Sequence, residues 1–159
     1  MLKNVVCAAA CSIIILWGNI TTAQDGHALT VVGTDGEEYV LHLDELDAME
    51  QVEFSTTTIW TEGAAVYSGV PVLHLLKAIG TRGRTLRMSA LNDYSVEMPV
   101  ADLDESAPII ATRVDGETLT VRDKGPFWII YPFDSDPEYR TEKNYARSVW
   151  QLKTITLPE

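Results

Sequence analysis

Arg122-Asp-Lys-Gly-Pro-Phe-Trp-Ile-Ile-Tyr-Pro132 is the stretch from which the architecture of this chain can be read. Its second half, 127–131, is a short and almost wholly apolar run between Gly-Pro and a second proline. A run of this length with turn residues at both ends is typical of a strand that is buried on both faces. We therefore predict a central strand over 127–131, with the other elements arranged around it.

On either side of this strand, the chain is rich in segments where apolar and polar residues alternate. Such alternation predicts half-buried strands, and Asp-Gly or Asn-Asp pairs between them predict tight turns. The predicted strands cover 29–32 and 39–43, 52–58, 86–90 and 94–98, 109–114 and 118–121, and 149–157.

One segment has a clear helical pattern. Pro71 occupies its first turn, Gly80 follows its end, and Val72, Leu75, Leu76 and Ile79 recur at helical spacing. This predicts a helix over 71–79, with His74 off the apolar stripe and on the surface. A short helix is also predicted over 44–49, capped by Asp44. The sum is a β-rich α+β single domain of mixed sheets with one clear helix and short helices.

The first 23 residues have the organisation of a cleaved secretory signal peptide. Lys3 gives the positive start, an apolar run follows over 5–20, and Thr21-Thr-Ala23 supplies small residues before the cut. A membrane anchor is the alternative, although the run falls short of the ~20 residues that a span needs. We expect a periplasmic protein with a signal peptide over 1–23 and one domain over 24–159.

Both cysteines, Cys7 and Cys11, lie in the predicted signal peptide. The exported domain is therefore expected to work without a thiol, a disulfide or a metal–thiolate bond. All 23 acidic residues but only 11 of the 12 basic residues follow residue 23. The formal charge changes from −11 to −12 on export, which disfavours nucleic acid as a partner because phosphate binding needs clustered cations.

Known catalytic and metal-binding motifs are missing. His27, His42 and His74 do not have the spacing of zinc ligands, and there is no phosphate-binding loop and no nucleophile elbow. The run Asp134-Ser-Asp-Pro-Glu138 begins like a calcium loop, but the sixth position is Tyr139 rather than glycine. The sequence thus predicts neither a metal site nor a catalytic residue.

Four stretches combine large rings with polar or basic residues: 54–60, 90–94, 122–132 and 147–152. Rings stack on the faces of a flat heteroaromatic ligand, while charged groups bind its edge or an anionic tail. Simple burial of each ring in the core is the alternative reading. The set as a whole favours a ligand site. Its candidate residues are Thr56, Thr58, Trp60, Asn92, Asp93, Tyr94, Arg122, Lys124, Trp128, Arg147 and Trp150.

The chain resembles the molybdopterin-binding domain of the sulfite oxidase family over nearly the whole of 24–159. The resemblance depends on the order and spacing of several anchors, none of which is specific alone. They are the strand-to-loop pattern that ends in Trp60, Gly69-Val-Pro71 with Leu75-Leu76, Asp93-Tyr94, Asp115-Gly116, Gly125-Pro126 with Pro132, and Trp150-Gln-Leu152. The resemblance implies the fold of that domain and a site for a pterin.

One departure changes what the resemblance implies. The family places a molybdenum-binding cysteine in a Phe-x-Cys-x-x-x-Trp pattern, and this chain has Phe54-x-Thr56-x-x-x-Trp60. A hydroxyl is a poor donor compared with a thiolate, so a molybdenum cofactor is not expected to be held here. Short, exported, cysteine-less members of this fold bind reduced pterins and act on the periplasmic sensor domain of a membrane protein that controls cyclic di-GMP. The chain is similar to these.

By that analogy, Trp60 or Trp128 would stack on a reduced pterin and Asp93 would accept hydrogen bonds from its amino edge, with Tyr94 in support. Arg122, Lys124 and Arg147 would neutralise an anionic group or an acidic partner. Two other readings stay open. One is a molybdopterin-dependent oxidoreductase that holds its cofactor by pterin contacts alone, and the other is a partner-binding module with a vestigial pocket.

Overall fold

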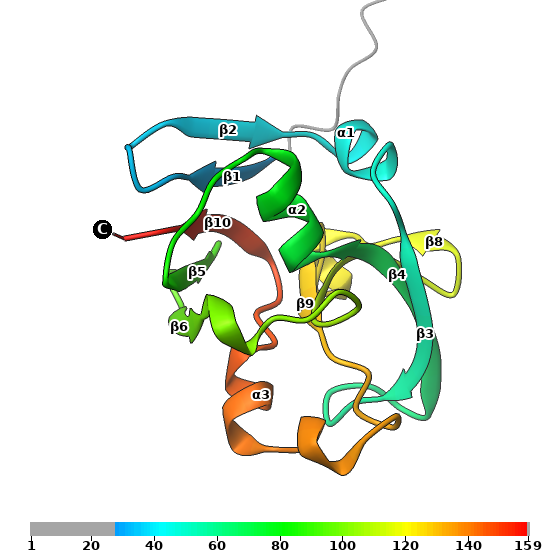
Figure 1. Cartoon of the computed structure of the whole chain (residues 1–159). Helices are drawn as coiled ribbons and strands as arrows, with labels where there is room; N and C mark the ends of the chain where they lie inside the picture. Colours follow the sequence, from blue (N-terminus) through cyan, green and yellow to red (C-terminus); the bar gives the residue numbers. More distant parts are fainter. Residues whose placement is uncertain (1–27, 159) are drawn as a thin grey trace, which may run out of the picture.

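A computed structural model describes residues 28–158 and arranges them in two sheets with three short α-helices (Figure 1). The strands are β1 (Leu29–Val32), β2 (Glu38–Leu41), β3 (Val52–Thr57), β4 (Ala64–Pro71), β5 (Thr85–Ala90), β6 (Ser95–Pro99), β7 (Ile109–Val114), β8 (Glu117–Thr118), β9 (Trp128–Ile130) and β10 (Leu152–Thr156). The helices are α1 (Leu43–Asp47), α2 (Val72–Ala78) and α3 (Glu142–Arg147), and the 3-10 turns are η1 (Val100–Asp102), η2 (Val121–Asp123) and η3 (Pro137–Tyr139).

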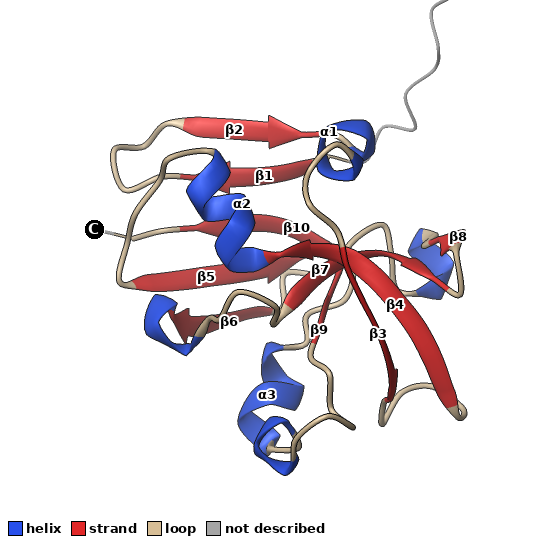
Figure 2. Ribbon diagram, turned by 45° about the vertical axis from the view of Figure 1, so that its right-hand side comes forward, coloured by secondary structure: helices blue, strands red, loops and turns tan. Residues whose placement is uncertain are grey.

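The first sheet has the order β2-β1-β10-β5-β6, and the second has the order β3-β4-β7-β8 with β9 also paired to β7. β1 and β10 are parallel, whereas the other pairs are antiparallel, so the first sheet is mixed. α2 lies across one face of the first sheet, and α3 lies beyond the end of β9 (Figures 1 and 2). The predicted β-rich α+β architecture is confirmed.

β9 lies between two apolar clusters. Ile129 packs with the first sheet and α2, whereas Trp128 and Ile130 pack with Tyr67 and Ile109 in the second sheet. The prediction of a strand buried on both faces is therefore confirmed. The strand is shorter than predicted and pairs only with β7, because its other edge bonds to the loop before β10: Ile129 N donates to Val149 O at 2.9 Å.

The eight-residue strand β4 has no counterpart in the sequence prediction. Its alanines, glycine and proline weaken the alternation by which strands are recognised. The structure pairs it with β3 on one side and β7 on the other, with a register shift between Ser68 and Gly69. In contrast, the strand predicted over 118–121 shrinks to β8, because the chain turns into η2 at Val121.

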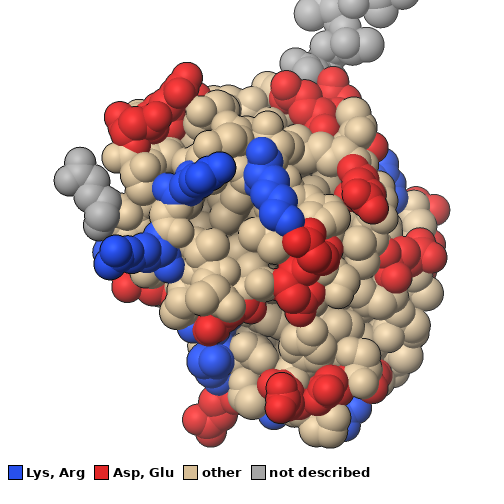
Figure 3. Space-filling view, viewed as in Figure 1, with Lys and Arg blue, Asp and Glu red and all other residues tan. Residues whose placement is uncertain are grey.

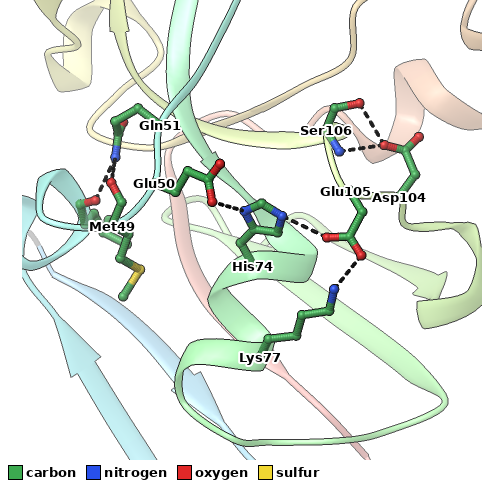
Figure 4. A network of polar contacts seen from close by, with 9 residues as sticks. Met49, Glu50, Gln51, His74, Lys77, Asp104, Glu105 and Ser106 are labelled. Carbon is green, nitrogen blue, oxygen red and sulfur yellow. Dashed lines mark hydrogen bonds and ion pairs between the residues drawn. The ribbon is translucent and has the colours of Figure 1, made fainter.

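Two helix predictions need correction. α1 begins at Leu43, and its N-cap is His42 rather than Asp44; the Glu45 carboxylate accepts a hydrogen bond from His42 N at 2.8 Å. α2 begins at Val72, with Pro71 as its N-cap rather than in its first turn. His74 lies off the apolar stripe, as predicted, and its side chain is 22% exposed between the exposed Glu50 and Glu105 (Figure 4). Lys77 and then His74 lower the pKa of the Glu105 carboxyl, so this network links α2 to the loop before β7.

The predicted signal peptide and the predicted cysteine-containing segment lie outside the described residues. Within 28–158, no helix is long and apolar enough to cross a membrane.

Candidate functional site

A cavity of about 350 Å³ opens where the loop after β3, the turn between β5 and β6, and α3 meet. Four rings line it: Trp60, Tyr94, Tyr145 and Trp150. Its polar lining comes from Asn92 and Ser148, and the small residues Ala90 and Ala146 leave room between the rings. We call this cavity the aromatic pocket. Its walls are apolar and aromatic with a few polar groups, which is the usual composition of a small-molecule site.

Trp60 is the centre of the aromatic cluster around this pocket. Its ring centroid lies 5.7 Å from that of Trp150, and 5.9 Å from those of Trp128 and Tyr145, all in edge-to-face geometry. Such pairs contribute about 0.5–1.5 kcal/mol each beyond burial. Because Trp60 is only half-buried, it anchors the loop after β3 through these contacts and still presents part of its ring to the pocket.

The turn between β5 and β6 forms the polar edge of the pocket. Asp93 has a φ of 65°, and the Asn92 side chain accepts a hydrogen bond from Tyr94 N at 3.1 Å. Tyr94 Oη donates to the carbonyl of Ala146 at 2.8 Å and so ties the turn to α3. The Asn92 amide and the Tyr94 ring therefore face the pocket from a fixed position. Asp93 is exposed in this turn but is not part of the lining.

The loop before β10 brings a third segment to the site. Gln151 has a φ of 51°, and its backbone N–H donates to Lys124 O at 2.8 Å while its side-chain amide donates to Val121 O at 2.9 Å. Its carbonyl accepts from Leu91 N at 2.9 Å. These bonds hold η2 and Lys124 beside the pocket segment that contains Trp150. The four stretches predicted from the sequence are therefore brought together.

Three predicted residues have roles within the fold. Trp128 is 1% exposed, and its indole N–H donates to Ser148 O at 3.2 Å. Arg147 is 7% exposed and bonds to the Asp102 carboxylate at 2.7 Å, which lowers the pKa of that carboxyl. The hydroxyl groups of Thr58 and Thr61 share a hydrogen bond of 2.6 Å, and the Thr58 hydroxyl accepts another from Trp60 N at 3.2 Å. Of these residues, none lines the aromatic pocket.

The two basic residues near η2 differ in exposure. Lys124 Nζ lies 5.6 Å from the centroid of the Trp128 ring, a cation–π distance, and the residue has a φ of 70°. Arg122 is exposed and makes no ion pair with any residue of the described range 28–158. Both remain candidates for an anionic group that extends from the pocket, since η2 is held beside Trp150.

Thr56, at the position of the family's metal-binding cysteine, is fully buried. Its hydroxyl accepts a hydrogen bond from Asp134 N at 3.0 Å and donates to Thr57 O at 3.3 Å. The Asp134 carboxylate accepts from the backbone N–H and the hydroxyl of Thr57 at 2.6 and 2.8 Å and pairs with Arg140 at 2.5 Å. The N–H of Thr57, followed by its hydroxyl and Arg140, lowers the pKa of Asp134.

This arrangement does not fit a molybdenum ligand. As a metal ligand, the Thr56 hydroxyl would be a hard, neutral oxygen rather than a thiolate. It already forms hydrogen bonds with Asp134 and Thr57, and the segment after β9 covers it. In the described part of the chain, no three His, Cys, Asp or Glu side chains are grouped so that they could hold a metal ion. The aromatic pocket, in contrast, has apolar and aromatic walls with only a few polar groups.

The role of Thr56 as a lock between β3 and the segment after β9 can be measured. We expect Thr56→Val to lower the free energy of unfolding by about 0.5–1.5 kcal/mol, because it removes the acceptor of the part-buried hydrogen bond from Asp134 N. Thr56→Ser keeps the acceptor and should cost less than Thr56→Val. Urea-induced unfolding followed by far-UV circular dichroism gives both values. Equal losses in the two variants would show that the hydroxyl is not the link.

Sequence reasoning missed five lining residues: Ala90, Tyr145, Ala146, Ser148 and Val149. Ala90, Ser148 and Val149 lie within the predicted stretches 90–94 and 147–152 but were not named as candidates, whereas Tyr145 and Ala146 belong to α3, which was not predicted as a helix. One signal was present. Thr141 is an N-cap whose hydroxyl accepts from Asn144 N at 3.2 Å, and the pattern Thr-x-x-Asn before an apolar residue is a helix start.

Comparison with solved structures supports the fold. The chain is similar to the sulfane dehydrogenase SoxCD from Paracoccus pantotrophus, with a TM-score of 0.63 at 17% sequence identity over 85% of this chain. It spans 38% of the length of that chain, so the likeness shows the fold alone. No curated protein matches the sequence. The family model of the oxidoreductase molybdopterin binding domain matches residues 17–133, more than half of the sequence, and the chain belongs to this family.

Proposed function

We propose that this chain is a periplasmic pterin-binding protein that holds a reduced pterin in the aromatic pocket without a protein ligand to molybdenum. The observation that carries the proposal is the combination of an intact ring-lined pocket with an enclosed Thr56. Family membership supports a pterin as the ligand class. The hydrogen bonds of the Thr56 hydroxyl argue against a metal anchored by this residue.

The shape and chemistry of the pocket suit a bicyclic heteroaromatic ring. Its volume of about 350 Å³ is at the small end of ligand pockets, which span roughly 300–1,000 Å³. In the proposed complex, the ring of Trp60 or Trp150 packs against one face of the pterin, since these two rings already contact each other edge to face at 5.7 Å. The Asn92 amide binds the polar edge of the pterin. Asp93, in the same turn, accepts a hydrogen bond from the amino group of the pterin.

We further propose that the protein passes on the state of its ligand to the periplasmic sensor domain of a membrane signalling protein, with control of cyclic di-GMP as the output. Exposed apolar residues beside the pocket support a partner at its mouth. Ile59 is 63% exposed and precedes Trp60, and Leu91 and Tyr94, each 45% exposed, flank the turn of Asn92. Exposed apolar groups of this kind are typical of interaction surfaces.

The test of ligand binding is a titration of the purified protein with tetrahydrobiopterin under anaerobic conditions. We expect quenching of tryptophan fluorescence and a matching heat of binding by calorimetry, because two tryptophans line the pocket. Ala146→Phe should abolish binding by filling the pocket from the exposed face of α3. Ala101→Phe, at an exposed alanine of η1, is the matched control and should bind normally. No binding at millimolar ligand would refute the proposal.

The second candidate is a molybdopterin-dependent oxidoreductase that keeps its cofactor by pterin contacts alone. The family's description as an oxidoreductase domain favours it. Metal analysis of protein purified from its native periplasm separates the two functions. We expect less than stoichiometric molybdenum, and one molybdenum per chain would favour the enzyme.

A further inference from the structure

Three basic residues border two neighbouring hollows on the face that carries α2. Lys77 and Arg82 line the first hollow, of about 400 Å³, and Arg84 lines the second, of about 300 Å³. Gly83 lies between them and lines both. The space-filling view of this face shows Lys and Arg side chains gathered around a recessed, uncharged area (Figure 3). We call this surface the basic hollow.

Within residues 28–158, the arginines of the basic hollow form no ion pair with a carboxylate. Arg87, Arg113, Arg140, Lys143 and Arg147 each pair with a carboxylate, and Lys77 pairs with Glu105. Arg82 and Arg84 are exposed and are among the cations that make no ion pair within 28–158. Two arginines of one loop that have no ion-pair partner among residues 28–158, beside an apolar hollow, suit an external anionic group.

The floor of the first hollow is apolar. Leu73 and Leu76 of α2 and Val100 of η1 contribute to its lining, and Leu73 and Val100 are only partly buried. A free phosphate or another small inorganic anion would leave this floor uncovered. An occupant that fits the whole surface carries an apolar side chain for the floor and negative charges on both sides of it.

The surroundings favour a narrow occupant over a flat anionic membrane. Asp35, Glu37 and Glu38 lie in the hairpin next to Thr34, which lines the second hollow, and Glu105 lies next to Lys77. A lipid surface would meet these carboxylates together with the arginines. A single polypeptide segment can place its carboxylates on Arg82 and Arg84 and an uncharged residue opposite Asp35, whose carboxylate lies beside Thr81 in the lining of the first hollow.

We propose that the basic hollow is a docking surface for an acidic segment of a partner protein. An apolar side chain of the segment covers Leu73, Leu76 and Val100, and its carboxylates bind Arg82 and Arg84. This surface is separate from the aromatic pocket. Arg84 and Ala90 lie at opposite ends of β5, roughly 20 Å apart for a strand of this length.

The probe is the synthetic peptide acetyl-Glu-Asp-Leu-Glu-Leu-Asp-Glu-amide, titrated by calorimetry into the full protein at 50 mM and 300 mM salt. We expect binding at low salt that weakens at least tenfold at high salt. We also expect a tenfold or greater loss in the double variant Arg82→Ala with Arg84→Ala. A peptide with both leucines replaced by serine should bind more weakly, since it cannot cover the apolar floor.

The matched control is Arg87→Ala with Lys153→Ala, which removes the same charge from β5 and β10. This control should keep peptide binding within threefold, and both double variants should bind tetrahydrobiopterin like the wild type. The docking surface is refuted by absence of peptide binding at millimolar concentration or by equal losses in the two double variants. It is also refuted if phosphatidylglycerol vesicles bind through Arg82 and Arg84 while the peptide does not.

Discussion

Gly69→Ala is expected to lower the free energy of unfolding by about 3 kcal/mol or more. A Cβ at this position would lie 2.0 Å from the carbonyl oxygen of Ile110 and 2.8 Å from the Cα of Ala111. Both atoms belong to the backbone of β7, so no side-chain rotation can relieve the clash. The register shift between Ser68 and Gly69 brings the two strands together at this point. Urea-induced unfolding followed by circular dichroism measures the loss.

Gly63→Ala is the matched control, because it makes the same substitution just before β4. Nothing lies within 4 Å of a Cβ at Gly63, but its φ of +69° should cost about 1 kcal/mol for a residue with a side chain. A loss in Gly69→Ala no greater than that in Gly63→Ala would show that β7 moves aside at little cost. The comparison thus isolates the close approach of the two strands from the conformational freedom of glycine.

Gly69 also illustrates how far the fold could be predicted. Alternation and turn residues were enough to predict most strands, and the apolar run around Trp128 correctly predicted a strand buried on both faces. β4 was missed because its identity depends on contact with β7 rather than on local pattern. Gly69 was identified in the sequence only as one anchor of the family resemblance. The reason that a glycine is needed there, the close approach of the Ile110 backbone, can be seen only in the structure.

The candidate site was predicted in part for a similar reason. Trp60, Asn92, Tyr94 and Trp150 line the aromatic pocket, as their ring-rich segments suggested. Trp128 is buried and does not line the pocket, whereas Trp150 does. Both tryptophans lie in ring-rich stretches, so the composition of the sequence cannot show which of them reaches the pocket. The ion partner of Arg147 was also hidden from the sequence, because Asp102 is 45 residues away.

Trp60→Ala is expected to remove most of the affinity for a pterin and to destabilise the fold. The substitution deletes a wall of the pocket and four edge-to-face contacts, with Trp128, Phe133, Tyr145 and Trp150. We expect a loss of about 2 kcal/mol in binding free energy, or roughly thirtyfold in affinity. The free energy of unfolding should fall by about 3 kcal/mol, at the lower end for a tryptophan because Trp60 is half-buried.

Two variants separate the loss of the wall from the loss of stability. Trp60→Phe keeps an aromatic face and should retain tetrahydrobiopterin binding within about fivefold, since a ring still closes the pocket. Ile155→Ala deletes fully buried atoms in β10, away from the pocket lining, and should cost a comparable 2–5 kcal/mol in stability while leaving the affinity nearly unchanged. If Ile155→Ala weakened binding as much as Trp60→Ala, the effect at Trp60 would be a consequence of a looser fold. If Trp60→Ala bound tetrahydrobiopterin normally, the aromatic pocket would not be the pterin site.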